Sequence, residues 1–246
     1  MNAKAKFFLH LQYFLGRITI IVTAPALLCV VKLFGYRIRN LKEFRRKVSG
    51  MMSAHKGPWL ICANHLTMID SVVLAYAMFP VYRYIWSFKL LAWNLPEKMN
   101  FNANKFVGAL CYLTKCIPVI RGGDREKVKS SLEKCAYLLK KGQSLMIFPE
   151  GTRSRDGRVD TVNFPYGVGR LVRNIPKCRV MCIYLRGDGQ KTYSNFPRYG
   201  ETFSAVVEEC RPTTQLKGLK AQRDCAGQIV NHLSQMEKNH FRICGK

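Results

Sequence analysis

The sequence has few acidic residues. It holds 15 aspartates and glutamates against 40 lysines and arginines, which gives a formal net charge of +25. A charge of this size concentrates anionic partners near the protein. Nucleic acid, an anionic bilayer surface and a phosphorylated or coenzyme-A-like substrate all fit, and charge alone does not choose among them. No recognised nucleic-acid-binding motif is present, so we expect no nucleic-acid partner.

The sequence also lacks any Cys-x-x-Cys pair, although it contains 10 cysteines. Two closely spaced pairs, Cys111/Cys116 and Cys178/Cys182, have no matching histidines, so we expect no zinc site and no other metal site. Several cysteines fall within apolar runs, where the thiol acts as a small hydrophobic group. This pattern indicates a reducing, cytoplasmic location without disulfides.

Internal repeats, low-complexity linkers and a boundary between two folded domains are all missing. The chain of 246 residues is long enough to bury a core, and its hydrophobic content of 48% excludes disorder. We therefore expect one folded domain over residues 36–246, preceded by a distinct apolar segment over residues 1–35.

No apolar run is long enough to cross a bilayer as a helix. The longest in the N-terminal segment, Ile18–Val31, has 14 residues against the about 20 that a membrane span needs. A signal peptide is one alternative, but no small-x-small cleavage site follows; a buried core helix is another. We favour a retained anchor that lies in one leaflet.

A basic segment follows the anchor. Residues 32–56 contain eight lysines and arginines and one acid, Glu43. An anionic cytoplasmic leaflet attracts such a segment, whereas a solvated helical face is the alternative. The sequence therefore predicts a membrane-associated protein at the cytoplasmic face of the inner or plasma membrane.

Apolar runs alternate with helical patterns along the rest of the chain. We expect strands at 59–63, 82–87, 117–120, 144–148 and 179–185, an edge strand at 201–209, and helices that include 66–79, 105–115, 164–174 and 219–236. Such alternation predicts an α/β fold with a mixed, mostly parallel sheet flanked by helices, to which the N-terminal membrane-associated helical segment is added.

A histidine and an aspartate five positions apart form the first candidate site. His65 follows the expected strand 59–63, and Asp70 lies on the expected helix 66–79. Backbone N–H groups at the start of a helix have no intrahelical hydrogen-bond partner and can bind a negatively charged group. A carboxylate about one helical turn from a histidine accepts one imidazole N–H and fixes the tautomer that a general base needs. The alternative is a pair with a structural role alone.

Two further motifs follow later strands. Arg121 comes at the end of the expected strand 117–120, where α/β sheets tend to place ligands; the alternative is a surface turn arginine. The stretch 148–154, Phe-Pro-Glu-Gly-Thr-Arg-Ser, follows another expected strand. In it, Gly151 lets the backbone approach a ligand closely, and the planar guanidinium of Arg153 can bind a phosphate through two hydrogen bonds.

Together these motifs are similar to those of a known family. Asn64-His65-(four residues)-Asp70 and Phe148–Ser154, in this order, resemble the glycerolipid acyltransferases of the 1-acylglycerol-3-phosphate (lysophosphatidate) acyltransferase type. The likeness covers about residues 58–190, and 117–121 looks like that family's middle motif. The chain departs from the family at Phe164-Pro-Tyr-Gly167, where a lysine-bearing Phe-Lys-x-Gly is usual.

The resemblance implies that an acyl group moves from acyl-CoA or acyl-carrier protein, as co-substrate, to a lipid hydroxyl without a cofactor. By this resemblance His65 takes the proton of the acceptor hydroxyl as its oxygen attacks the thioester, and Asp70 orients His65. The residues expected to shape the acceptor site are Arg121, Glu150, Gly151, Thr152 and Arg153. The expected partners are a membrane lipid, such as 1-acylglycerol-3-phosphate, and the acyl donor.

Other functions remain open from the sequence. A divergent acyltransferase would use another lysolipid, an ornithine-type lipid or a polyene-type or polyketide-like acceptor. A thioester hydrolase would use water in place of the acceptor. A non-catalytic basic protein that binds anionic lipid or nucleic acid would explain the charge, but it would leave the His65/Asp70 and Phe148–Ser154 motifs without a role.

Overall fold

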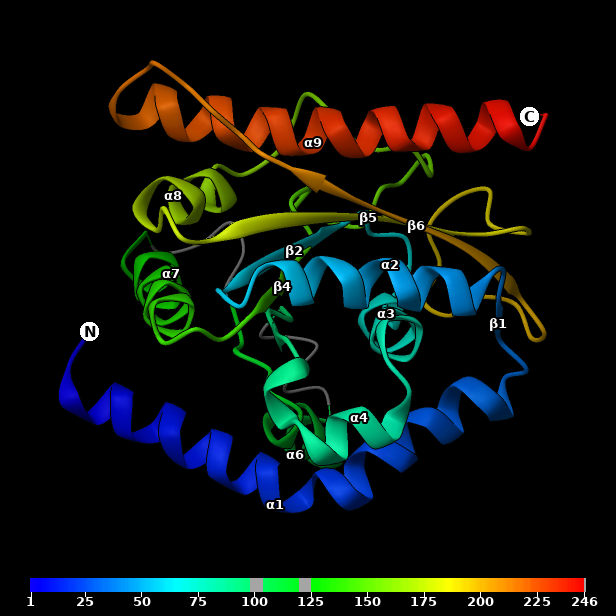
Figure 1. The fold of residues 1–246 in the computed structure, drawn as a ribbon, viewed down its shortest axis with the longest axis horizontal. Helices are drawn as coiled ribbons and strands as arrows, with labels where there is room; N and C mark the ends of the chain where they lie inside the picture. The colour runs from blue at the N-terminus through cyan, green and yellow to red at the C-terminus, as the bar shows by residue number, and fades with distance from the viewer. Residues whose placement is uncertain (98–103, 120–124, 246) are drawn as a thin grey trace.

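The computed structural model describes residues 1–97, 104–119 and 125–245. Its centre is a six-stranded sheet in the order β1-β6-β5-β2-β4-β3 (Figure 1). The strands are β1 (Arg37–Ile38), β2 (Trp59–Ala63), β3 (Trp93–Asn94), β4 (Leu145–Ile147), β5 (Arg179–Gly187) and β6 (Thr202–Cys210). β5 and β6 pair antiparallel and the other neighbours pair parallel, which confirms the mixed, mostly parallel sheet.

β2 lies at the middle of the sheet because its side chains are apolar on both faces. It pairs with β4 on one side, where Ile61 faces Met146, and with β5 on the other, where Cys62 faces Cys182. All five of its residues are buried. A strand that is buried on both faces has a continuous apolar run, as here, and its carboxyl end opens toward the site described below.

Helices cover both faces of the sheet (Figure 1). One face packs against α1 (Ala3–Leu33), α2 (Leu41–Ala54), α3 (Asp70–Met78) and α4 (Val81–Trp86) through a core that includes Trp59, Ile61 and Ile183. The other face packs against α7 (Arg125–Lys140), α8 (Gly167–Asn174) and α9 (Gly218–Ile243). The short η1 (Phe88–Leu90) and α6 (Lys105–Leu113) complete the described helices.

Three expectations about secondary structure are wrong in detail. The segment expected as a strand at 82–87 is the helix α4. A run of six residues is too short to distinguish the helical period of 3.6 from the strand period of 2, and Tyr84 is the one buried residue of α4. The helix expected from residue 66 begins at Asp70. The segment 117–120 is no regular strand in its described part: Val119 forms an isolated bridge to Glu97, and Cys116, just before the segment, forms one to Asn94 of β3.

The sheet also extends beyond the strand expected at its edge. β6 carries β1 on its outer side, where Arg37 pairs with Thr202. A strand of two residues has too short a pattern to be found from sequence. On this side of the sheet the edge strand is therefore the short β1, and β6 is an inner strand.

α1 is longer than the apolar run suggested. It continues for 31 residues through Pro25, and Figure 1 shows it curving along the side of the molecule opposite α9. Within the described ranges, α1 is the one helix that is long and apolar enough to cross a membrane, judged by length and composition alone. It packs against α3, α4 and α6, and the division into residues 1–35 and 36–246 stays a prediction.

Candidate active site

The turn after β2 is fixed by the side chain of Asn64. Its Nδ2 donates to the carbonyl of Leu185 at 2.9 Å, and its Oδ1 accepts from the Leu185 N–H at 2.7 Å. This amide therefore continues the pairing of β2 with β5 by one residue after the regular ladder ends. The next residue, His65, leaves the sheet from a fixed position.

Asp70 organises the turn between His65 and α3. Its Oδ2 accepts from His65 Nδ1 at 3.0 Å and from the N–H groups of Leu66 and Thr67 at 2.7 and 2.8 Å. Its Oδ1 accepts from the Thr67 hydroxyl. These four contacts use the acceptor capacity of both carboxylate oxygens. A carboxylate only accepts, so the neutral tautomer of His65 that fits this contact carries its proton on Nδ1 and keeps the lone pair on Nε2.

The imidazole of His65 is also packed in place. Its ring stacks on Phe148, which follows β4, with ring centroids 4.0 Å apart and planes 14° apart. The backbone carbonyl of His65 accepts a hydrogen bond from the Ser154 N–H at 3.0 Å. The side chain is about 11% exposed, so one edge of the ring still reaches open space. His65 is therefore held by a hydrogen bond to Asp70, a stacked ring and a backbone contact.

Glu150 lies behind His65 and does not line the pocket. Its Oε1 accepts from the His65 N–H at 3.0 Å, and its Oε2 accepts from the Asp160 N–H at 3.3 Å. Burial raises the pKa of Glu150 from its ordinary value to about 8, although both N–H donors oppose the rise. The geometry gives this carboxyl a supporting position that ties the 149–160 loop to the histidine turn.

Gly151 and Arg153 continue the same loop. Gly151 has φ of +75°, and a Cβ there would lie 2.8 Å from Cγ of Pro165, so glycine is required at this position. Arg153 Nη1 donates to Asn195 Oδ1 at 2.8 Å and to the Ser194 carbonyl at 3.2 Å. Both contacts use Nη1, so the Nε and Nη2 donors of the guanidinium can bind an anion.

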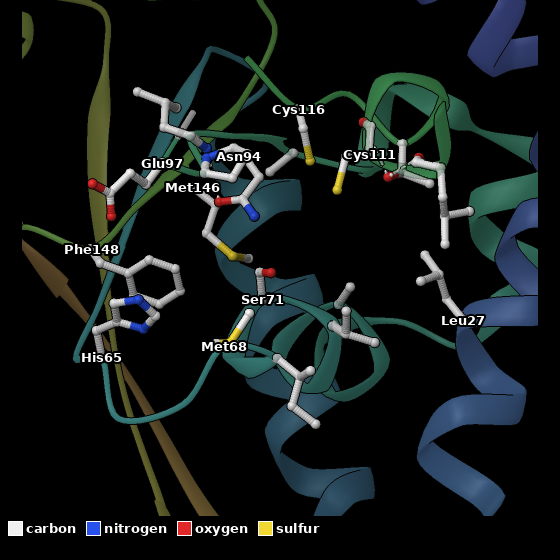
Figure 2. A pocket seen from close by; sticks show the side chains of 18 of the residues that line it. Leu27, His65, Met68, Ser71, Asn94, Glu97, Cys111, Cys116, Met146 and Phe148 are labelled. Carbon is white, nitrogen blue, oxygen red and sulfur yellow. Dashed lines mark hydrogen bonds between the residues drawn. The ribbon is translucent and has the colours of Figure 1, made fainter. Parts of the chain in front are cut away.

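A pocket of about 690 Å³ begins at His65. Its polar lining includes Thr152, Arg153 and Arg155, which follow the His65–Phe148 contact in the chain, and Ser71, Asn94, Glu97 and Thr114. Apolar side chains, many of them from α3, α6 and α1, line most of the remainder. Figure 2 shows His65 and Phe148 at one end and Leu27 of α1 at the other, with Met68 and Met146 between them. The volume lies within the about 300–1,000 Å³ of small-molecule sites. A polar end and a long apolar body fit an amphipathic ligand.

The predicted site residues are only partly brought together. His65, Thr152 and Arg153 line the pocket, Asp70 and Glu150 support His65 from behind, and Gly151 shapes the loop. Arg121 lies outside the described residues. No group of three or more side chains that suits a metal ion occurs within the described ranges. The roles of these residues in binding and catalysis stay predictions.

The roles of several side chains at the site were not predicted from sequence. Thr67 contributes two donors to Asp70, Phe148 stacks on His65, and Arg155 lines the pocket beside Arg153. Phe148 begins the motif stretch 148–154 and Arg155 follows it directly, so the sequence did point to this region. The walls contributed by α1 and α6 had no such signal, because their apolar residues resemble ordinary core positions.

Comparison with known proteins decides the family. A family model described as Acyltransferase matches residues 37–186, which is more than half of the chain and includes the whole His65–Ser154 region. The chain belongs to the acyltransferase family. The resemblance found in its motifs is thereby confirmed at the level of the family.

Two plant acyltransferases are similar to part of this family member. The 1-acyl-sn-glycerol-3-phosphate acyltransferase LPAT1 (chloroplastic) of Arabidopsis thaliana is 31% identical over 102 residues, which is 42% of this chain and 25% of the relative. The corresponding BAT2 protein of Brassica napus is 29% identical over 102 residues, 42% of this chain and 26% of the relative. The chain thus matches about a quarter of the length of these curated relatives.

Proposed function

We propose that this protein is a membrane-associated O-acyltransferase that moves an acyl group from a thioester donor to the hydroxyl of a lysolipid. The donor would be acyl-CoA or acyl-carrier protein, and the acceptor a lysophospholipid such as 1-acylglycerol-3-phosphate. The observation that carries the proposal is the His65–Asp70 pair, held in one tautomer at the polar end of a long apolar pocket. Membership of the acyltransferase family supports the same chemistry.

In this mechanism the base is Nε2 of His65. It takes the proton of the acceptor hydroxyl while the hydroxyl oxygen attacks the thioester carbonyl. Collapse of the tetrahedral intermediate breaks the carbon–sulfur bond, and the imidazolium returns its proton to the leaving thiolate. Asp70 keeps Nδ1–H in place and balances the positive charge that forms on the ring. No protein nucleophile is required.

The remaining pocket residues suit the two ends of the substrates. The acyl chain occupies the apolar body of the pocket, where it is removed from water. Arg153 and Arg155 at the polar end suit a phosphate of the acceptor or donor. The cytoplasmic face of a membrane as the location fits the excess of basic residues and the apolar α1.

Variants of the dyad test the proposal. The protein would be incubated with labelled acyl-CoA or acyl-carrier protein and a panel of lysolipids, with mass spectrometry of the products. We expect His65→Ala and Asp70→Asn to lower acyl transfer by about 10²–10⁴-fold, because the base or its orientation is lost. Circular dichroism would show that both variants remain folded.

Two outcomes would contradict the proposal. Full activity of folded His65→Ala would exclude His65 as the base. Consumption of the thioester with release of free fatty acid, and no acylated lipid from any acceptor, would instead identify a thioester hydrolase.

A further inference from the structure

Two cysteine side chains lie side by side in the wall of the pocket. Cys111 belongs to the last turn of α6 and Cys116 follows this helix, and both line the pocket. A hydrogen bond joins the two thiols, and in Figure 2 their sulfur atoms point toward each other. Both cysteines are free, and the proposed acyl transfer uses neither of them. The pair is therefore a reactive group that still lacks a role.

The turn after α6 brings these thiols together. The Cys116 N–H donates to the Cys111 carbonyl at 2.9 Å, and Lys115 has a left-handed backbone with φ of +62°. A hydrogen bond of this span, with a left-handed residue just before its donor, is typical of the Schellman motif. In this motif the two side chains at the positions of Cys111 and Cys116 meet, usually as an apolar contact. Here the contact consists of two thiols.

Buried side chains hold this turn in place. Lys115 is fully buried, and its Nζ donates to two backbone carbonyls of the segment 88–91 at 2.8 Å each. Gln12 of α1 donates through Nε2 to the carbonyls of Tyr112 and Cys116 at 2.9 Å each. The two thiols are thus kept close together before any reaction, and little conformational freedom is lost when a bond forms between them.

The two thiols differ in reactivity. Cys111 is partly exposed, whereas Cys116 is 7% exposed. The hydrogen bond from Cys116 lowers the pKa of the Cys111 thiol, although burial opposes this change. The same hydrogen bond, and then burial, raises the pKa of Cys116. Because the thiolate is the nucleophilic form of cysteine, Cys111 reacts first and Cys116 second.

We propose that Cys111 and Cys116 are a modification site, where a peroxide joins the two thiols in a disulfide that a thiol reductant reverses, and that this change in the wall of the pocket weakens the binding of an acyl chain. The reduced pair is the resting form in a reducing compartment. The inference rests on the proposed function only in taking an acyl chain as the ligand of this pocket.

The reaction is balanced with a peroxide as the oxidant. The Cys111 thiolate attacks one peroxide oxygen, the O–O bond breaks, and Cys111 becomes a sulfenic acid while hydroxide leaves. The Cys116 sulfur then attacks the sulfenic sulfur, so that an S–S bond forms, the S–O bond breaks and water leaves with the Cys116 proton. In total two thiols lose two hydrogen atoms and hydrogen peroxide becomes two waters. A dithiol reductant reverses the change by exchange and becomes a disulfide itself.

A disulfide at this position changes the shape of the pocket wall. An S–S bond is about 2.0 Å long, which is shorter than any contact between unbonded thiols, so the two segments must move closer. The segment after Cys116 is fixed to the sheet, because the Ile117 N–H donates to the Asn94 carbonyl at 2.8 Å. The movement therefore falls on α6, where Val107 and Leu110 also line the pocket. A chain that fits the reduced wall then fits the oxidised wall less well.

Trypsin allows a direct test, because it cleaves after Lys115 and separates the two cysteines. Cys111 then lies in the peptide 106–115 and Cys116 in the peptide 116–121. The full-length protein would be treated with hydrogen peroxide, blocked with iodoacetamide in denaturant and digested without reductant. We expect the two peptides to be joined, with two hydrogen atoms fewer than their sum, and to separate in dithiothreitol. Recovery of both peptides with blocked thiols, or a disulfide from Cys111 to the exposed Cys29, would overturn the proposal.

Single serine variants test the order of the reaction. In Cys116→Ser the oxidised Cys111 has no second thiol to react with, so we expect a sulfenic acid that dimedone traps. Cys111→Ser is the matched control, in which we expect about 10-fold less trapping at the buried Cys116. Equal trapping in the two variants would overturn the role given to Cys111.

Binding of radiolabelled palmitate tests the effect on the pocket. We expect peroxide to lower the affinity of the protein for palmitate by about 5-fold or more, and dithiothreitol to restore it. The double variant Cys111→Ser/Cys116→Ser, shown by circular dichroism to be folded, should not respond to peroxide. Equal palmitate affinity of the reduced and the oxidised protein, or the same response of the double variant, would overturn the proposal.

These measurements keep the inference separate from the acyltransferase proposal, because none of them requires acyl transfer. Folded His65→Ala should form the same disulfide and show the same change in palmitate affinity. A redox response without acyl transfer by the unaltered protein would reject the proposed function alone. Acyl transfer by a protein whose two peptides stay unjoined would reject the modification site alone.

Discussion

Both the side chain and the backbone of His65 are held by contacts. The side chain is fixed by Asp70 and Phe148, and the backbone is fixed by Glu150 at its N–H and by Ser154 at its carbonyl. A general base gains from such preorganisation because little rearrangement is needed when the proton moves. These contacts hold the imidazole in one orientation, in which Nδ1 faces Asp70 and Nε2 lies on the other side of the ring.

Glu150 should make stability depend on pH. Its pKa in the folded protein is about 8, above its ordinary value, so the folded state keeps a proton that the unfolded state releases. This contribution to the free energy of unfolding is fully present below the unfolded pKa, about 4.3, and is lost as the pH rises to about 8.

Denaturation in urea between pH 5 and pH 9 measures this effect, with Glu150→Gln as the comparison. The difference in free energy of unfolding between the unaltered protein and the variant should shrink or reverse as pH rises, and become constant above about pH 8. Parallel curves across the whole range would show that Glu150 is ionised throughout.

The sequence could predict the pair but not its surroundings. His65 and Asp70 are close in the chain, so one helical turn brings them together. Glu150 reaches the His65 N–H across 85 positions of sequence, through the pairing of β2 with β4. Such a contact depends on the register of two strands, which the local pattern does not specify.

At the scale of elements, helices and strands were predicted where their pattern was long. β5 spans nine residues and α9 spans 26, and both lie where expected. The errors concern short elements, such as α4 with six residues and β1 with two. α6 and α1 were expected as helices, but their shared pocket wall arises from packing and not from either sequence alone.

The contact between α1 and α6 should be sensitive to one added methyl group. Gly16→Ala places Cβ 2.4 Å from the Leu113 carbonyl oxygen and 2.7 Å from Cζ of Phe88, so the helices must separate. We expect a loss of about 1–3 kcal/mol in the free energy of unfolding. Chemical denaturation would measure it.

Gly50→Ala is the matched control for this change. Gly50 lies in α2 with nothing within 4 Å of the added Cβ. Alanine there should stabilise the protein by about 0.5–1 kcal/mol, because it favours the helix. Similar effects of the two substitutions would mean that α1 is not packed closely on α6.

At the scale of the whole molecule, the net charge of +25 acts together with the apolar α1. A positive charge of this size attracts anionic surfaces over a distance, and exposed apolar side chains favour contact with lipid. Charge alone did not distinguish among nucleic acid, lipid and substrate in the sequence. Exposed apolar side chains on α1, a helix without acidic residues, favour lipid among these partners.

Salt should therefore weaken binding to charged vesicles selectively. Raising the ionic strength from about 0.05 M to about 0.5 M shortens the reach of the protein's field, and we expect a fall of about 10-fold or more in affinity for phosphatidylglycerol vesicles. Sedimentation of vesicles with bound protein would measure it. Neutral phosphatidylcholine vesicles should show weak binding that changes little, and an equal salt effect on both would contradict the prediction.

The pairing of β2 with β5 has a consequence for synthesis. Cys62 lies opposite Cys182, and Asn64 is bonded to Leu185, so the turn that holds His65 needs partners encoded about 120 positions later. During translation α1 is complete long before the ribosome reaches β5, and its apolar faces have no folded domain to cover them. The position of His65 is therefore fixed only after β5 has been synthesised.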